Sequence, residues 1–131
     1  MDNKTLLSLA EKAALHSYSP YSGFSVGAAL LCSDGEVYTG CNVENVSFSA
    51  TNCAERTAVF SAVADGKRDF VKIAVIAKKN GKTASFTPPC GVCRQVLSEF
   101  CEDDFSVVMT DGVNIKETAL SELLPFSFSE I

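Results

Sequence analysis

Apolar residues along the chain recur with two periods, one typical of helices and one typical of strands. Helical spacing predicts four helices, over residues 4–16, 52–64, 91–100 and 118–124. Alternating or continuous apolar runs predict five strands, over residues 24–31, 37–41, 71–77, 105–109 and 114–116. Both kinds of element are therefore expected along the whole length of the chain.

The order of these elements predicts the fold. Ser33-Asp34-Gly35 is a turn sequence, so the first two strands form a hairpin. After the hairpin, helices alternate with strands, and this order places helices on both faces of a central sheet. We predict an α/β fold with three layers, α/β/α, around a central mixed five-stranded sheet, in a single domain spanning residues 1–131.

Length and charge narrow the classes of function. A chain of 131 residues with 47% hydrophobic residues has the size of one domain with an apolar core. Its net charge of −5 makes a nucleic-acid polymer an unfavourable partner, because binding a phosphate backbone needs basic residues. No apolar run approaches the ~20 residues that span a bilayer, and Glu11 and Lys12 interrupt the apolar N-terminus where a signal peptide needs its core. We expect a cytoplasmic protein with no membrane partner.

The chain has six cysteines and one histidine. Three disulfides of a secreted scaffold are one possible use of the cysteines, but such scaffolds belong to shorter, exported chains. Cys32, Cys41 and Cys101 fall within predicted strands or at a helix end and are interpreted as small core residues. His16 falls within the first predicted helix, so ordinary packing is its favoured role.

Cys90 and Cys93 form a Cys-x-x-Cys pair, which can be redox-active, metal-binding or coincidental. The pair opens the predicted helix 91–100, and Cys53 opens the predicted helix 52–64. In a sheet of this kind two crossover helices begin at the same edge, so the three cysteines can meet there. Three protein ligands with an open fourth position are the arrangement of catalytic zinc.

Two runs carry a family resemblance, Thr51-Asn52-Cys53-Ala54-Glu55-Arg56 and Pro88-Pro89-Cys90-Gly91-Val92-Cys93-Arg94-Gln95. They resemble the cytidine deaminases of the small, three-cysteine zinc class, and the resemblance extends from about Leu6 to Phe128. It implies zinc-dependent hydrolytic deamination of cytidine and deoxycytidine to uridine and deoxyuridine. The ammonia is released, and the reaction is a step of pyrimidine salvage.

The resemblance also implies how the chemistry is divided among residues. One Zn²⁺ per chain is held by Cys53, Cys90 and Cys93. Glu55 is the general acid and base, which moves protons to the pyrimidine N3 and to the departing ammonia. Three thiolates leave the zinc site with a negative formal charge, which weakens its activation of water. The N-termini of both predicted helices and the Arg56 guanidinium offset that charge.

Further matches concern the substrate. Asn42 and Glu44, in the run Asn42-Val43-Glu44-Asn45, match family residues that hydrogen-bond the ribose, particularly its 3′-hydroxyl. Phe24 matches an aromatic wall against which the base packs, and Ala54 matches a further substrate contact. The resemblance therefore implies a small nucleoside as the substrate.

The C-terminal matches concern assembly. Phe128 matches a phenylalanine that closes the active site of a neighbouring subunit, which implies a homotetramer with shared active sites. Gln95, like Arg56, matches a residue that lies next to the metal ligands without binding the metal itself. Phe48 stands where the family commonly has a tyrosine, so it lacks a hydroxyl for an intersubunit hydrogen bond.

Three alternatives to a nucleoside deaminase stay open. Blasticidin deaminases share the Cys-Ala-Glu and Pro-Cys-Gly-x-Cys-Arg-Gln motifs, but the run 42–45 favours a plain nucleoside. The tRNA adenosine deaminases usually place histidine where this chain has Cys53, and they need a basic surface. A catalytically silent zinc-binding module would bind metal and release no ammonia from cytidine.

Overall fold

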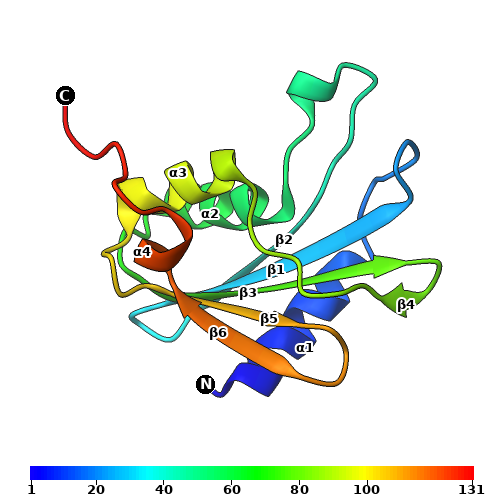
Figure 1. Cartoon of the computed structure of the whole chain (residues 1–131), viewed down its shortest axis with the longest axis horizontal. Coiled ribbons are helices and arrows are strands. Elements are labelled where there is room, and N and C mark those ends of the chain that lie inside the picture. The colour runs from blue at the N-terminus through cyan, green and yellow to red at the C-terminus, as the bar shows by residue number, and fades with distance from the viewer.

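A mixed β-sheet forms the centre of the structure, a computed structural model that describes residues 1–131 (Figure 1). Its strands are β1 (Phe24–Cys32), β2 (Val37–Cys41), β3 (Phe70–Lys79), β4 (Lys82–Thr83), β5 (Ser106–Thr110) and β6 (Ile115–Ala119). Five of them lie side by side in the order β2-β1-β3-β5-β6, and β4 pairs with the end of β3. β3 and β5 run parallel, while the other neighbouring pairs are antiparallel. The predicted mixed sheet is confirmed, with β4 as a short addition.

Helices cover both faces of this sheet (Figure 1). They are α1 (Asn3–Ala14), α2 (Ala54–Ala64), α3 (Gly91–Phe100) and α4 (Leu120–Leu123), and the 3-10 turn η1 (Phe48–Ala50) precedes α2. α1 lies on one face, while α2 and α3 lie beside each other on the opposite face. None of these helices has the length and apolar character that a membrane span requires.

Alternation along the strands divides the apolar core between the two faces. Leu30 and Ile73 are fully buried on the face that α2 and α3 cover. Ala29 and Ala74, one position away on the same strands, are fully buried against α1. Because successive side chains of a strand point to opposite faces, each central strand contributes to both cores. The predicted three-layer α/β/α architecture is confirmed.

The last strand and the last helix meet at a different residue from the one predicted. The sequence predicts a strand over 114–116 and a helix from Thr118, whereas β6 continues to Ala119. Thr118 pairs with Val107 and Ala119 pairs with Ser106, so backbone hydrogen bonding to β5 extends the strand. Only four residues remain for α4.

The prediction for His16 needs correction, and the sheet has one strand more than predicted. α1 ends at Ala14, so His16 lies beyond the helix and is exposed rather than packed on it. A turn at Asn80-Gly81 returns Lys82 to pair with Lys79, which adds a strand to those predicted from the sequence. β4 is that pairing, and it contains two residues.

Gly40 allows β2 to approach α2 closely. A Cβ atom built at Gly40 would lie 2.5 Å from Ala58 N and 2.6 Å from Ala54 O. Any side chain at this position would overlap the helix backbone, so only glycine permits the observed separation. Gly40 thus sets the distance between β2 and the start of α2.

Gly40→Ala is expected to lower the free energy of unfolding by about 1–3 kcal/mol, because β2 or α2 must move to admit the methyl group. Urea unfolding followed by circular dichroism measures the change. Gly91→Ala is the matched control, since a Cβ atom there meets nothing within 4 Å. A Gly40→Ala protein with the unfolding midpoint of wild type would contradict this account of the contact.

Candidate active site

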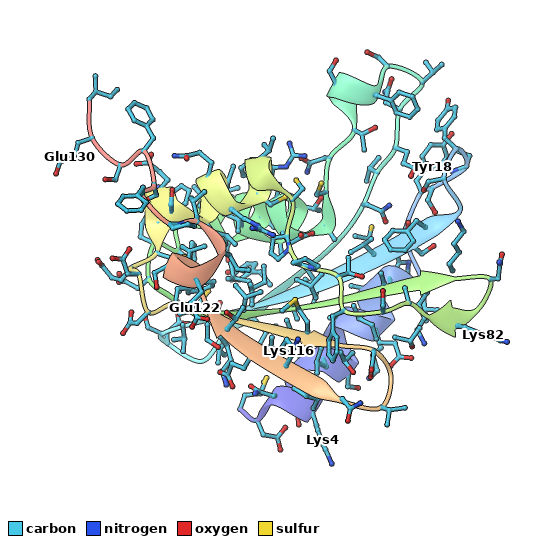
Figure 2. The ribbon with its side chains drawn as sticks, viewed as in Figure 1. Lys4, Tyr18, Lys82, Lys116, Glu122 and Glu130 are labelled. Atoms are coloured by element: carbon cyan, nitrogen blue, oxygen red, sulfur yellow. The ribbon has the colours of Figure 1, made fainter.

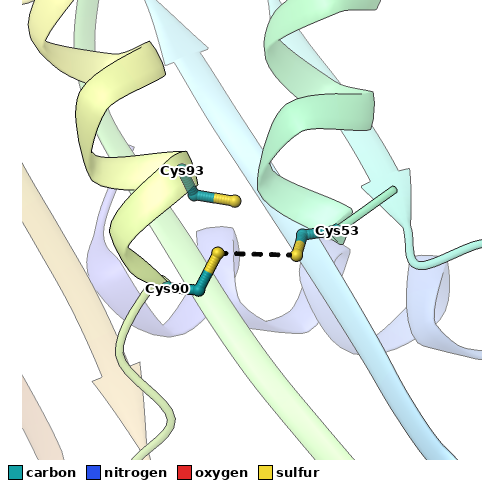
Figure 3. Close-up of side chains that lie close together, drawn as sticks. All are labelled: Cys53, Cys90 and Cys93. Atoms are coloured by element: carbon teal, nitrogen blue, oxygen red, sulfur yellow. Dashed lines mark hydrogen bonds between the residues drawn. The ribbon is translucent and has the colours of Figure 1, made fainter. Parts of the chain in front are cut away.

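Three cysteine side chains converge where α2 and α3 begin (Figure 3). Cys53 is the N-cap residue of α2, Cys90 is the N-cap residue of α3, and Cys93 lies in the first turn of α3. Their Sγ atoms lie within 4.8 Å of one another, and Cys53 Sγ is 3.7 Å from Cys90 Sγ. The fold therefore brings together the three residues that the sequence predicts as metal ligands.

The geometry of this cluster fits a zinc ion. Tetrahedral Zn²⁺ with Zn–S bonds of about 2.3 Å places two sulfurs about 3.8 Å apart, close to the distance between Cys53 and Cys90. No fourth histidine, cysteine, aspartate or glutamate joins the cluster. A set of three protein ligands is the pattern of catalytic zinc sites, whereas structural sites use four.

Local electrostatics favour the thiolate form of Cys53. Hydrogen bonds from the Cys93 thiol and the Arg56 guanidinium lower the pKa of Cys53 below the usual range of a thiol, although burial opposes the shift. Arg56 Nη2 donates to Cys53 Sγ across 3.3 Å, and Arg56 Nε is buried without a partner in the chain. Because zinc binds thiolates rather than thiols, Cys53 is prepared for metal binding at neutral pH.

The cysteines outside the cluster have different surroundings. All six cysteines are free of disulfides, so the structure gives no support to a disulfide-linked scaffold. Burial raises the pKa of Cys101 to about 12, and burial also raises the pKa of Cys32. Both packed side chains are therefore thiols at neutral pH. Cys41 is half-buried on β2, away from the cluster.

Glu55 is buried two residues after Cys53, in the first turn of α2. Only 5% of the residue is exposed. Burial, aided by the charge of Cys53, raises the pKa of Glu55 to about 7. A carboxyl group with a pKa near neutral can both take and give a proton, which is the requirement for a general acid–base catalyst.

A cavity of about 410 Å³ opens beside Glu55. Its wall contains seven of the predicted site residues: Phe24, Asn42, Glu44, Cys53, Ala54, Glu55 and Cys90. The volume lies within the range of small-molecule sites. The cavity therefore joins the cysteine cluster to the residues that the resemblance assigns to substrate binding.

Asn42 and Glu44 reach the cavity from the segment that follows β2. The buried side chain of Asn42 is held by three hydrogen bonds within the chain. The Glu44 carboxylate accepts hydrogen bonds from the N–H groups of Tyr21 and Ser22 and from the Ser22 hydroxyl. The Ser22 hydroxyl lowers the pKa of Glu44, so this carboxyl is ionised at neutral pH and acts only as an acceptor.

Phe128 and Gln95 lie outside this cavity. Phe128 is 69% exposed on the C-terminal segment, and its carbonyl accepts a hydrogen bond of 2.9 Å from Gln95 Nε2. Figure 2 shows the same segment, with Glu130, projecting away from the helices. Within one chain these two residues contact each other and not the cysteine cluster.

Six lining residues are not identified by the sequence patterns: Ser22, Val26, Thr51, Lys79, Thr87 and Pro88. Lys79 reaches the cavity because the register of β1 and β3 sets it opposite Phe24. Periodicity does not reveal register, so no sequence signal pointed to Lys79. Pro88 is the first residue of the run that contains Cys90, and Thr87 immediately precedes that run, so their position is a signal that could have found them.

Comparison with known proteins identifies the family of this chain. The sequence model of the cytidine and deoxycytidylate deaminase zinc-binding region matches residues 1–109. The chain belongs to the cytidine deaminase family. A cytidine deaminase from Sporosarcina psychrophila is 49% identical over 99% of this chain and 93% of that protein. A blasticidin-S deaminase from Bacillus cereus is 31% identical over 79% of this chain and 76% of that protein.

A solved cytidine deaminase shares the fold. The crystal structure of the Burkholderia pseudomallei enzyme superposes with a TM-score of 0.90 at 44% identity, covering 98% of this chain and 100% of that one. Membership of the cytidine deaminase family makes the present chain a hydrolase with a zinc-binding deaminase region. The cluster of Cys53, Cys90 and Cys93 fits that zinc.

Proposed function

We propose that this chain hydrolyses free cytidine and deoxycytidine to uridine and deoxyuridine. In the reaction the C4–N bond to the amino group breaks, a C4–O bond to the oxygen of water forms, and ammonia leaves. One juxtaposition carries the proposal. Buried Glu55 and the cysteine cluster share a cavity with Asn42 and Glu44, whose polar groups suit a sugar hydroxyl.

The proposal includes one zinc ion per chain, held by Cys53, Cys90 and Cys93. When bound, zinc supplies Lewis-acid activation of a water molecule. Arg56 donates a hydrogen bond to Cys53 Sγ and brings a positive charge to the cluster. The N-termini of α2 and α3 add partial positive charge at Cys53 and Cys90. Together these groups offset the negative charge of three thiolates.

Glu55 moves the protons of the reaction. Its carboxylate takes a proton from the attacking water, and the resulting carboxyl donates a proton to the pyrimidine N3. It then takes the proton of the new C4 hydroxyl and gives it to the amino group, so that ammonia leaves as the C4–N bond breaks and the C4 carbonyl of uridine forms. The pKa of about 7 that burial produces allows Glu55 to act in both directions near neutral pH.

The nucleoside is held by residues on several sides of the cavity. Phe24, half-buried at the start of β1, packs against the base, and Ala54 contacts the base from the start of α2. Asn42 and Glu44 hydrogen-bond the 3′-hydroxyl of the sugar. None of these contacts involves the 2′ position, so cytidine and deoxycytidine are both expected to react.

The proposal also includes a homotetramer in which Phe128 of each chain closes the cavity of a neighbouring subunit. Its support is apolar surface: Phe128 is exposed, and Val46 and Phe48 are each 78% exposed on the segment that leads to α2. Exposed apolar groups of this size are typical of interaction surfaces. Phe48 lacks the hydroxyl of tyrosine, so its contribution to assembly is apolar contact alone.

Two further features support a small substrate. The cavity volume suits a nucleoside, and the net charge of −5 disfavours a nucleic-acid polymer. A role in pyrimidine salvage and a cytoplasmic location stay predictions.

Ammonia release from cytidine, deoxycytidine, adenosine and blasticidin S tests the proposed function. The zinc-loaded protein is expected to release ammonia from the first two and not from adenosine. A higher kcat/KM for blasticidin S than for cytidine would show that the Bacillus cereus relative is the better guide to substrate. Bound zinc with no ammonia from any of the four would identify a silent zinc-binding module instead.

A further inference from the structure

The side chain of Asn42 is held in one orientation by groups from two other segments. Its Oδ1 accepts a hydrogen bond of 2.9 Å from the N–H of Val26 and one of 2.5 Å from the hydroxyl of Ser17. Its Nδ2 donates across 2.8 Å to the carbonyl of Phe24. Asn42 is only 7% exposed, so these bonds satisfy polar atoms that have little access to water.

These partners establish the positions of the oxygen and the nitrogen in the Asn42 amide. A backbone N–H can only donate and a backbone carbonyl can only accept, so Oδ1 must face Val26 and Nδ2 must face Phe24. One N–H of Nδ2 is then used, and the other makes no hydrogen bond within the chain. Because Asn42 lines the cavity, it offers a ligand a donor and not an acceptor.

Ser17 is the one side chain that bonds the Asn42 amide. It follows α1, 25 positions before Asn42, and it does not line the cavity. Its Oγ also lies 3.2 Å from Ser19 Oγ, which in turn lies 3.3 Å from Ser25 Oγ. Oδ1 can only accept, so the single hydroxyl proton of Ser17 points to Asn42.

Glu44 offers a ligand hydrogen-bond acceptors, whereas Asn42 offers it a donor. It is ionised and accepts three hydrogen bonds from the loop residues Tyr21 and Ser22, so it presents only acceptor capacity to a ligand. A hydroxyl group is the partner that accepts from Asn42 Nδ2 while it donates to Glu44. A carbonyl oxygen cannot donate, a protonated amine cannot accept, and a methylene can do neither.

We propose that Ser17 is a positioning residue that holds the Asn42 amide with its free N–H toward the 3′-hydroxyl of the nucleoside. Without the Ser17 hydroxyl, the amide loses one of its two Oδ1 partners and its orientation becomes less restricted. Substrate binding through the 3′-hydroxyl would then weaken, while the rate of the reaction at C4 would stay the same. The inference depends on the proposed function for the identity of the ligand.

The kinetics of Ser17→Ala with deoxycytidine and with 2′,3′-dideoxycytidine test the proposal. For deoxycytidine, KM should rise about three- to tenfold, the range expected for weakening one hydrogen bond, while kcat stays within about twofold of wild type. Dideoxycytidine lacks the 3′-hydroxyl, so wild type and Ser17→Ala should share one KM for it. Ser8→Ala, a substitution of an exposed serine on α1, is the matched control and should behave as wild type.

Two kinetic results would overturn the proposal. One is an unchanged KM for deoxycytidine in Ser17→Ala. The other is an equal rise in KM for dideoxycytidine, since that would indicate general loosening of the cavity rather than loss of a contact to the hydroxyl.

A measurement on the free protein separates this inference from the proposed function. In ¹⁵N-asparagine-labelled protein, the Nδ2 protons of Asn42, identified by their absence in Asn42→Ala, should exchange with solvent faster in Ser17→Ala than in wild type. Unchanged exchange would overturn the role of Ser17 whatever the activity. Faster exchange in a protein that deaminates neither cytidine nor deoxycytidine would uphold the Ser17 contact and reject the proposed function.

Discussion

Glu55→Gln is expected to remove deamination while the protein stays folded and zinc-loaded. The amide keeps the shape of the side chain but cannot transfer protons near neutral pH, so kcat should fall by about 10²- to 10⁴-fold. The neutral glutamine suits a position where burial already raises the pKa of the carboxyl to about 7. Ammonia release from cytidine and metal analysis on the same sample measure both parts of this expectation.

Glu99→Gln is the matched control for this substitution. Glu99 is exposed on α3 and outside the cavity, so kcat should equal that of wild type. A Glu55→Gln protein with wild-type kcat would reject the proton-transfer role. A Glu55→Gln protein that had lost its zinc would show that Glu55 is a metal ligand.

Cys90→Ala is expected to remove both the metal and the activity. Two thiolates hold zinc far more weakly than three, so the zinc content of purified protein should fall from about one per chain to near zero. Cys90 is exposed, and its truncation leaves no cavity in the apolar core. A lower melting temperature would therefore report the lost metal, whose binding contributes free energy to folding. Metal analysis, ammonia release and thermal unfolding together measure the effect.

Cys41→Ala tests whether the effect belongs to the cluster. Cys41 lies on β2 outside the group of three thiols, so the variant should keep its zinc and its turnover. Removing zinc from wild type with a chelator should reproduce the Cys90→Ala phenotype, and adding zinc back should reverse it only in wild type. A Cys90→Ala protein that retains one zinc per chain would contradict the three-cysteine site.

Much of the fold follows from local patterns in the sequence. Runs rich in β-branched and other apolar residues at 71–77 and 105–109 predicted strands that the structure shows largely buried in the sheet, as β3 and β5. The turn Ser33-Asp34-Gly35 predicted the β1–β2 hairpin, which the register confirms. These signals succeed because burial and turn geometry act on neighbouring residues.

The failures occur where a distant segment decides the local structure. Thr118 has the spacing of a helix, but pairing with Val107 of β5 makes it a strand residue. At Thr118, propensity over a short window gives way to hydrogen bonding with another strand.

The sequence likewise predicted one part of the candidate site and left another part untested. The spacing of Cys90 and Cys93 and the position of Cys53 at a second helix start were sufficient to predict a cluster, because helix N-termini in such sheets share an edge. Phe128 and Gln95 contact each other in the structure, and their predicted roles in a neighbouring subunit and behind the metal ligands stay predictions.

The order of amino acids thus established the layers of the fold, the cysteine cluster and the class of chemistry, since each depends on residues close in sequence or on a motif at fixed spacing. The distance of α2 from the sheet at Gly40, the reach of Lys79 into the cavity and the orientation of Asn42 by Ser17 became apparent from the folded chain. These features join segments far apart in the sequence. They arise only when the whole chain selects the packing that buries its apolar surface and pairs its buried polar groups.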